Sequence, residues 1–375
     1  MNELSQIAVC EPVISGRELE YVTDAIKTGW ISSSGGYVDK LERAFADYLG
    51  VSSAVTTTSG TAALHLALVA AGVGPGDEVI IPAFTMIATA TAICQTGALP
   101  VLVDADPATW NLDPAQVARK VTARTKVLLP VHVYGHACDM DALAQATAGR
   151  DVMVIEDAAE AIGSEYRGKR CGALGKMACF SFFANKLITT GEGGMVVTSD
   201  PELNARLRYY KNLCFPRSGP RRYLHEDVGF NYRMPNLLAA FGLGQLERAD
   251  QFLAARRANA QAYNELLRGE RGVTTPPEAD YTLSSYWMYS ILIEDDFGLT
   301  RDEVMQGLAA AKIETRPFFI SMHRQPALAN YGVDVSGAYP VTDDLSRKGL
   351  YLPSGSGLTR PQIERVVGAL LALRR

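Results

Sequence analysis

Short apolar segments alternate with amphipathic segments along the first two hundred residues of the chain. The apolar segments, which are rich in Val and Ile, occupy 53–58, 78–83, 100–104, 126–133, 152–156 and 193–199. Apolar runs of this length are typical of strands buried on both faces of a parallel sheet, with helices as the crossovers. The pattern therefore predicts a large, doubly wound α/β domain with a parallel or mixed sheet.

Capping signals mark several helix boundaries. Ser15 and Glu18 have the spacing of a capping box ahead of the first helical periodicity. A second amphipathic segment follows, and Gly50 is its expected stop. Near the end of the chain, Thr359 and Gln362 have the same capping-box spacing ahead of an amphipathic final helix.

The pattern changes beyond residue 200, where the chain becomes more helical and more charged. A long helical segment runs from 237 to about 267, and a strand-like run follows at 285–294. At 375 residues the chain is too long for one compact core. We expect a large domain at 1–249, which includes an N-terminal helix, and a small C-terminal α+β domain at 250–375.

Charge and cysteine usage narrow the functional classes. The net charge of -5 argues against a nucleic-acid or anionic-membrane surface as partner. The six cysteines show neither a C-x-x-C pair nor a compact spacing, so we predict no disulfide framework and no metal site. The chain has no signal-peptide pattern and no apolar run of eighteen residues. These features indicate a cytoplasmic enzyme.

The candidate chemistry is concentrated between residues 152 and 200. Asp157 ends an apolar strand run, and Lys186 lies between the apolar residues near Phe183 and a glycine-rich loop. A partly desolvated lysine is the amine that a Schiff base requires, and a carboxylate at a strand end can keep a pyridinium nitrogen protonated. The pair suggests pyridoxal phosphate (PLP). The alternative is that Asp157 caps a turn and Lys186 is an ordinary loop lysine.

A second signal concerns an anion. The segment Ser59-Gly60-Thr61 links a β-rich run to an Ala/Leu-rich helix, so free backbone N–H groups and the positive end of the helix dipole would meet there. This arrangement would suit a phosphate. Since no G-x-G-x-x-G motif follows any of the predicted strands, a nicotinamide dinucleotide is disfavoured.

Several longer segments carry a resemblance to a known family. EDAAEAIGSEYRGKRCGALG, CFSFFANKLITTGEGGMVVT, SGTAALHLAL and GFNYRMPNLLAAFGLGQLER resemble the signature segments of the DegT/DnrJ/EryC1/StrS sugar aminotransferases, and the resemblance runs nearly end to end. It implies a fold-type I PLP-dependent transferase. The Asn-Lys pair at 185–186 and the EDAAEA stretch are most similar to members that aminate a nucleotide-linked 4-keto-6-deoxy sugar.

The resemblance assigns roles to individual residues. Lys186 would be the lysine that bonds to PLP and shuttles the proton, and Asp157 would hold the ring nitrogen. Glu160 stands where many relatives have a Gln beside the ring oxygen. The family usually places an aromatic ring over the cofactor where this chain has Met86, and Phe84 is the other candidate for that contact. The expected phosphate contacts are Gly60, Thr61, Ser181 and Asn231.

The resemblance also implies a partner and substrates. Asn231 would reach the cofactor phosphate of a neighbouring subunit, so we expect a homodimer with shared active sites. Glutamate would donate the amino group to the keto sugar. Trp30, Arg222 and His323 are candidate walls of the sugar pocket, although Arg222 could belong to a solvated basic loop and His323 to the core.

Two other functions remain open from the sequence. The acceptor could be a keto-cyclitol or an eight-carbon keto sugar, because acceptor choice depends on a few pocket contacts. The chain could also be a PLP-binding regulator without catalysis. A regulator would be expected to carry a basic DNA-binding module, and the sequence shows none.

Overall fold

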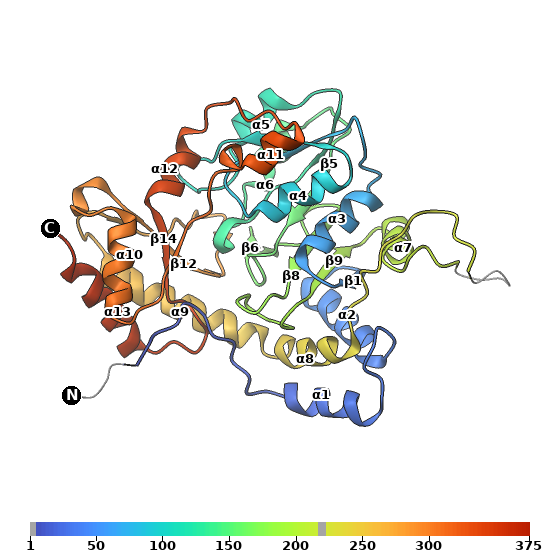
Figure 1. Cartoon of the computed structure of the whole chain (residues 1–375), viewed down its shortest axis with the longest axis horizontal. Coiled ribbons are helices and arrows are strands. Elements are labelled where there is room, and N and C mark those ends of the chain that lie inside the picture. Colours follow the sequence, from blue (N-terminus) through green and yellow to red (C-terminus); the bar gives the residue numbers. More distant parts are fainter. Residues whose placement is uncertain (1–4, 217–222) are drawn as a thin grey trace.

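A large α/β body with a smaller C-terminal region at one end makes up the chain. The computed structural model describes residues 5–216 and 223–375 (Figure 1). The N-terminal segment lies against the C-terminal region, since Ile7 pairs with Ile313 in a parallel bridge. Within the described residues, no helix has both the length and the apolar character needed to cross a membrane.

A seven-stranded sheet forms the centre of the large body. Its strand order is β1-β9-β8-β5-β4-β2-β3. The strands are β1 (Ser53–Thr57), β2 (Glu78–Pro82), β3 (Leu99–Val103), β4 (Thr125–Leu128), β5 (Met153–Asp157), β8 (Met177–Ser181) and β9 (Gly194–Thr198). β9 is antiparallel to both β1 and β8, whereas the other pairs are parallel. The prediction of a mixed, mainly parallel sheet is confirmed.

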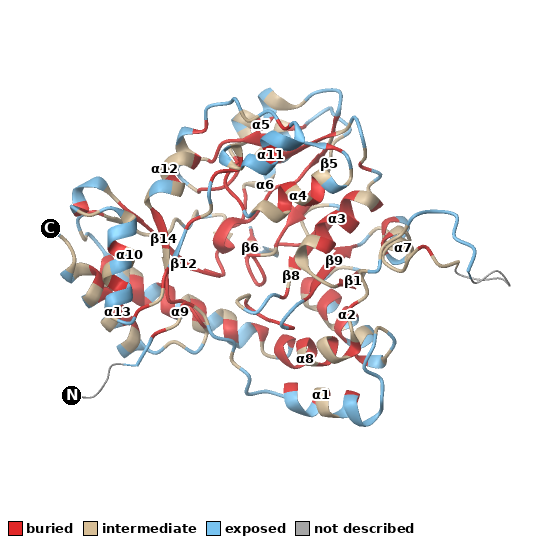
Figure 2. Ribbon diagram, in the orientation of Figure 1, coloured by how far each residue is buried: buried red, intermediate tan, exposed pale blue. Residues whose placement is uncertain are grey.

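Helices cover both faces of this sheet. In β2, Val79 and Ile81 point into one core cluster, while Ile80 between them points into the opposite one. The helices on the Val79 side are α3 (Gly60–Ala70), α4 (Ile87–Gln95) and α7 (Pro201–Tyr210), and those on the other side are α2 (Gly36–Leu49), α5 (Pro114–Lys120), α6 (Met140–Ala146) and α8 (Asn236–Leu246). Burial is concentrated in the sheet and the inward helix faces (Figure 2).

The C-terminal region has a sheet and a core of its own. The four antiparallel strands, in the order β10-β12-β14-β13, are β10 (Val273–Thr274), β12 (Tyr289–Ile293), β14 (Gly349–Leu352) and β13 (Arg316–Pro317). They share a core with α9 (Ala249–Leu267), α10 (Arg301–Ala310) and α13 (Arg360–Ala372). This is the α+β arrangement expected for the end of the chain.

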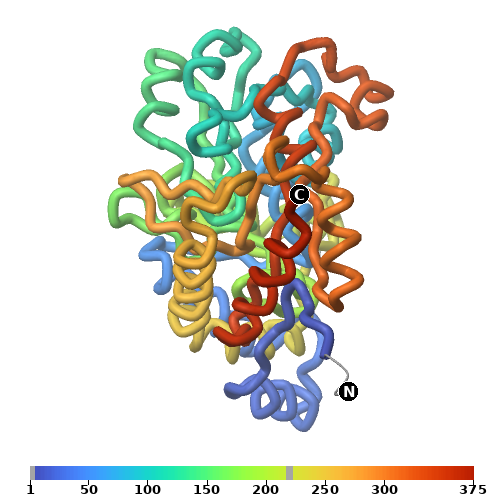
Figure 3. The backbone as a smooth tube through the Cα atoms, turned by 90° about the vertical axis from the view of Figure 1, so that its left-hand side faces the viewer, coloured from blue at the N-terminus to red at the C-terminus, as the bar shows by residue number. Residues whose placement is uncertain are grey.

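One part of the C-terminal region packs back onto the large sheet. The segment with α11 (Pro326–Tyr331) and α12 (Pro340–Lys348) lies beside the large body (Figure 3). It contributes Phe318, Met322 and Tyr339 to the core cluster that covers β2 and β5. A short sheet also joins β11 (Thr282–Leu283) to β6 (Glu165–Tyr166) and β7 (Lys169–Arg170). The domain boundary expected at 249/250 stays a prediction.

The two predicted capping boxes have different outcomes. The box of Thr359 and Gln362 is formed at the start of α13. The first box is wrong, because α1 (Glu18–Lys27) begins without a side-chain cap. Ser15 Oγ accepts a bond from Arg248 Nη1 at 2.6 Å, and the buried Glu18 accepts one from Gln245 Nε2 at 2.6 Å. Contacts with distant helices therefore replace the local cap.

The predicted long helix from 237 to about 267 is also corrected. It consists of two helices, α8 and α9, with a break at Glu247–Arg248. α8 is buried almost all round, and α9 carries the chain from the large sheet into the C-terminal core. The break allows the two helices to follow different surfaces.

Candidate active site

A cavity of about 340 Å³ lies where β5 and β8 end and where α3 and α4 begin. In mainly parallel sheets this edge is the usual ligand position. The cavity brings together most of the residues predicted from the sequence. These are Gly60, Thr61, Met86, Asp157, Glu160, Ser181 and Lys186.

Asp157 is the last residue of β5 and only 4% exposed. Its Oδ2 accepts a bond from Thr89 Oγ1 at 2.8 Å, and its Oδ1 accepts one from the Ala159 N–H at 3.2 Å. Burial raises the pKa of this carboxyl, although both hydrogen bonds favour the ionised form. Two accepted bonds leave lone pairs free for a further N–H donor in the cavity.

Lys186 follows β8 in the loop that leads to β9. Its Nζ lies 3.6 Å from the ring centroid of Trp287, which comes from the C-terminal region. Burial lowers the pKa of Lys186, and the nearby carboxylates of Glu160 and Asp157 oppose that shift. The loss of hydration at the amine outweighs the two carboxylates and makes the neutral, nucleophilic form more available.

Glu160 is a buried carboxyl beside this lysine. Its Oε2 accepts the backbone N–H of Tyr134 at 2.8 Å. Burial raises the pKa of Glu160 to about 7, even though the charge of Lys186 lowers it. Tyr134 has a φ of 52°, which is uncommon for a residue other than glycine. In this backbone conformation its N–H points to Glu160 Oε2. Glu160 can therefore carry a proton near neutral pH.

The start of α3 forms an anion cradle. The Ser59 side chain caps Ala62 N at 3.1 Å, and the N–H of Ala63 bonds to the Ser59 carbonyl at 3.0 Å. The amides of Gly60 and Thr61 stay available, because the first N–H groups of a helix have no partner inside it. A Cβ on Gly60 would come within 2.8 Å of Ser181 Cβ, so a side chain there would enter the cradle.

Met86 rather than Phe84 is placed to cover a ring. Met86 lines the cavity, is 48% exposed and caps α4 through its sulfur, which accepts the Ala88 N–H at 3.0 Å. Phe84 is fully buried and packs against Tyr134, Phe318 and Phe319 instead. Contact between Met86 and a bound ring stays a prediction.

Three predicted residues lie outside this cavity. Trp30 is 58% exposed, and its carbonyl accepts a bond from Asn236. His323 bonds to Asp343 at 3.2 Å and stacks on Tyr339, which fits its alternative as a packed histidine. Asn231 is exposed, as a residue meant for another subunit would be. Arg222, together with Arg217 and Arg221 of the same loop, lies outside the described residues.

Sequence reasoning missed several residues of the site. Thr89 holds Asp157, Trp287 covers Lys186, and Phe319 and Tyr351 line the cavity. Thr89 could have been found from its place in the first turn of the helix that starts after Met86, where it also lines the cavity. Trp287, Phe319 and Tyr351 come from the C-terminal region, and nothing local in their segments indicates what they pack against.

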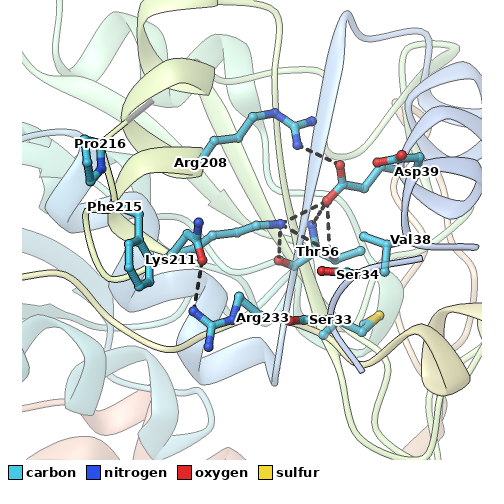
Figure 4. Close-up of a pocket in the computed structure, with 13 residues that line it drawn as sticks. Ser33, Ser34, Val38, Asp39, Thr56, Arg208, Lys211, Phe215, Pro216 and Arg233 are labelled. Carbon is cyan, nitrogen blue, oxygen red and sulfur yellow. Dashed lines mark hydrogen bonds and ion pairs between the residues drawn. The ribbon is translucent and has the colours of Figure 1, made fainter. Parts of the chain in front are cut away.

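A larger cavity of about 780 Å³ lies between α2, β1 and the segment that follows α7 (Figure 4). The buried Glu42 accepts bonds there from Lys211 Nζ at 3.1 Å and from Arg208 at 2.9 Å, and it also binds the backbone and hydroxyl of Thr56. Glu42 therefore forms an ion pair with each of the two cations, Arg208 and Lys211. The Lys211 amine is held in an ion pair with Glu42, and the residues predicted from the sequence line the smaller cavity instead, so the smaller cavity is the candidate active site.

The smaller cavity fits PLP. A free carboxylate lone pair at Asp157 suits a protonated ring nitrogen, and the Gly60 and Thr61 amides suit a phosphate. Lys186 provides an amine between these two ends. The Oδ1 of Asn185, next to Lys186, is buried without a hydrogen-bond partner among the described residues, which leaves one more polar atom for a bound group.

Solved structures define the class of protein. DesV from S. venezuelae matches with a TM-score of 0.89 and 37% identity, covering 95% of this chain and 94% of that one. The putative sugar aminotransferase Spr1654 from Streptococcus pneumoniae, in its PMP form, matches with a TM-score of 0.91 and 28% identity over 98% of each chain. The fold and the site are those of a PLP-dependent aminotransferase.

Sequence comparisons define the family. The family model described as the DegT/DnrJ/EryC1/StrS aminotransferase family matches residues 12–371. A GDP-perosamine synthase from Caulobacter vibrioides is 46% identical over 371 residues, which is 99% of each chain. This chain belongs to the DegT/DnrJ/EryC1/StrS aminotransferase family.

Proposed function

We propose that this enzyme moves an amino group from glutamate to a nucleotide-linked 4-keto-6-deoxy sugar, with Lys186 as the catalytic lysine. The observation that carries the proposal is the convergence of the Lys186 amine and the Asp157 carboxylate in one cavity beside the helix cradle of Gly60 and Thr61. These three features match the reactive group, ring nitrogen and phosphate of one cofactor.

When bound, PLP supplies an electron sink for the bond changes at the amino carbon. Asp157 holds the proton on the ring nitrogen, because its buried carboxylate is fixed by Thr89 and Ala159 and faces the cavity. Gly60, Thr61 and Ser181 bind the phosphate and set the position of the ring. Together these contacts orient the cofactor before any proton moves.

With PLP bound, Lys186 Nζ would be the base that takes the proton from the amino carbon and the acid that returns it. The depressed pKa of its amine makes the neutral form more available for this transfer. Glu160 carries a proton on its carboxyl near neutral pH, so it can donate a hydrogen bond to the ring oxygen instead of repelling it. Trp287 and Phe319 exclude water from this end of the cavity.

The acceptor is proposed from the 46% identity to a GDP-perosamine synthase over almost the whole of both chains. A keto-cyclitol or an eight-carbon keto sugar is the rival acceptor. A non-catalytic PLP-binding regulator is the rival from another class. The enclosed lysine with its lowered pKa favours catalysis over simple binding.

The test is a turnover assay on purified enzyme with PLP and glutamate. GDP- and dTDP-linked 4-keto-6-deoxy sugars and scyllo-inosose are supplied in parallel, and products are identified by mass spectrometry. The proposal expects a 4-amino sugar from a nucleotide-linked substrate and no turnover by Lys186→Ala. Amination of scyllo-inosose alone would refute the proposed acceptor, and a lack of any glutamate half-reaction would refute the aminotransferase assignment.

A homodimer with shared active sites is part of the proposal. Its support is the exposed position of Asn231, outside the cavity of its own chain, next to Asn212, with which it forms a β-bridge. A neighbouring subunit could then receive this side chain at its phosphate cradle. All six cysteines are free thiols, which supports the proposed cytoplasmic location.

A further inference from the structure

The lysine loop contacts a buried arginine from the C-terminal side of the chain. Arg256 lies on α9 and is only 2% exposed. Its Nη1 donates to the Trp287 carbonyl, and its Nη2 contacts the Lys186 carbonyl at 3.5 Å and Cys10 Sγ at 3.2 Å. The Arg256 guanidinium therefore bridges the backbone of Lys186 and the backbone of Trp287.

Arg256 has no ion-pair partner among the described carboxylates; its described partners are the two carbonyls, the Cys10 sulfur and the Ser356 hydroxyl at 3.3 Å. A buried cation usually has a carboxylate beside it, because the desolvation of a charge is costly. The positive charge is thus not cancelled locally and acts on its surroundings. The nearest titratable amine in those surroundings is on Lys186, whose own carbonyl Arg256 contacts.

We infer that Arg256 is a positioning residue for the reaction: its fork holds Lys186 and Trp287 in register, and its charge favours the neutral amine of Lys186. This inference rests on the proposed role of Lys186. The fork is needed because a lysine at 256 would present all its N–H donors from one nitrogen and could not span both carbonyls. The Trp287 ring, 3.6 Å from Lys186 Nζ, is placed through the same bond.

Other charged or titratable groups also face Lys186. Those that act on it directly are Glu160, Asp157, Arg256 and Cys10, and the cavity lining adds Glu192 and Tyr351. The two carboxylates Glu160 and Asp157 raise the pKa of Lys186, whereas burial and Arg256 lower it. Without the arginine charge, less would counter the two carboxylates, and the pKa of Lys186 would rise. The amine would then stay protonated up to a higher pH.

The test measures the reactivity of Lys186 in the cofactor-free full-length chain. Acetic anhydride labels only neutral amines, and the extent of labelling at Lys186 is read by peptide mass spectrometry from pH 6 to pH 10. Arg256→Gln removes the charge and keeps an N–H donor, Arg256→Lys keeps the charge and loses the fork, and Arg257→Gln on the same helix is the matched control. Arg257 pairs with Glu278 instead.

Arg256→Gln is expected to move the labelling midpoint of Lys186 to higher pH and to slow labelling at pH 7 by roughly threefold or more. Arg256→Lys should keep the wild-type midpoint but release PLP faster, because the lysine loop and Trp287 are no longer held together. Arg257→Gln should match wild type in both measurements.

Three results would overturn the inference. An unchanged midpoint in Arg256→Gln, or an equal shift in Arg257→Gln, would remove the role of the charge. Wild-type PLP retention by Arg256→Lys would remove the role of the fork, and this result stays decisive even if Arg256→Gln does not fold. Failure of the proposed role of Lys186 is distinguishable, since wild-type protein would then not attach PLP to Lys186 at all, and a different acceptor sugar would leave these measurements unchanged.

Discussion

Asp157 is buried and Lys186 is half-buried, yet one has to stay charged and the other has to lose its charge. Burial disfavours the charged form of each, and the local partners decide the result. Thr89 and Ala159 donate hydrogen bonds to Asp157, which supports its carboxylate. For Lys186, burial lowers the pKa and outweighs the nearby charges of Glu160 and Asp157, so the neutral amine becomes more available.

Asp157→Asn tests the ring-nitrogen role without changing the shape of the site. The amide cannot hold the nitrogen protonated, so we expect the glutamate half-reaction to slow by on the order of a hundredfold or more, while PLP still binds through its phosphate. Stopped-flow absorbance measures the half-reaction. A rate within about twofold of wild type would contradict this role.

Glu160→Gln tests the buried carboxyl through the pH dependence of stability. Because the pKa of Glu160 is raised from an ordinary 4.5 to about 7, the folded chain keeps a proton that the unfolded chain releases. This contribution is fully present below pH 4.5 and is lost as the pH rises through about 7. Urea titrations of the cofactor-free proteins give the difference in free energy of unfolding between wild type and Glu160→Gln. This difference should fall as the pH rises across the window. A difference that does not vary with pH would refute the raised pKa.

The sequence was sufficient for the residues that lie next to each other in short motifs. Asp157 ends a strand run and Lys186 precedes a glycine loop, so the roles expected of them follow from local patterns, whereas the role expected of Glu160 comes from the family resemblance. Trp287 and Arg256 could not be assigned in this way, because their importance depends on packing between segments about seventy to one hundred residues away from Lys186. The interpretation of His323 as a pocket wall failed to anticipate its bond to Asp343.

At the scale of elements, a single glycine keeps the start of α3 open for a phosphate. Gly60→Ala places a Cβ within 2.8 Å of Ser181 Cβ, so Ser181 or the helix start has to shift. We expect PLP to bind about tenfold more weakly, a cost of about 1.4 kcal/mol. Gly36→Ala is the control, because Gly36 also begins a helix and a Cβ there meets no atom within 4 Å. Equal PLP affinity in the two variants would contradict the cradle.

A buried carboxylate next to Asp157 organises the loop behind β5. Glu156 accepts the N–H groups of Gly172, Leu174 and Gly175 at 2.7 to 2.8 Å and contacts His132 Nε2 at 3.0 Å. The His132 ring accepts the Cys138 N–H at Nδ1, so its Nε2–H donates to Glu156. Of the two adjacent acids, Glu156 thus holds the structure of the loop, and Asp157 faces the cavity.

Glu156→Gln should destabilise the fold, since an amide NH₂ would face groups that are themselves donors. We expect a loss of about 3 kcal/mol in the free energy of unfolding. Urea titration with Glu226→Gln as an exposed control measures it. A loss below about 1 kcal/mol would show that the loop does not depend on this carboxylate.

The failed cap at Ser15 and Glu18 shows where local rules lose to tertiary contacts. Both side chains had the right spacing, but Arg248 and Gln245 offered them stronger partners. The strands were predicted well because burial on both faces leaves a continuous apolar run. The long helix was divided incorrectly because neither a proline nor a glycine marks the break between α8 and α9.

At the scale of the whole molecule, an active site shared between subunits predicts complementation. Lys186→Ala and Asn231→Ala homodimers should each be nearly inactive. In a mixed dimer, one site receives Lys186 from one chain and Asn231 from the other, so activity should return after subunit exchange. Turnover assays measure the recovered activity, and sedimentation velocity measures the oligomeric state. Absence of recovery in mixed dimers would contradict the role of Asn231 across the interface.

The most direct test concerns the lysine itself. Wild-type enzyme loaded with PLP is reduced with borohydride, digested and analysed by peptide mass spectrometry. A phosphopyridoxyl group on the peptide containing Lys186, and its absence from the Lys186→Ala protein, is the expected result. Attachment to any other lysine, or no attachment at all, would contradict the assignment of this cavity as the active site.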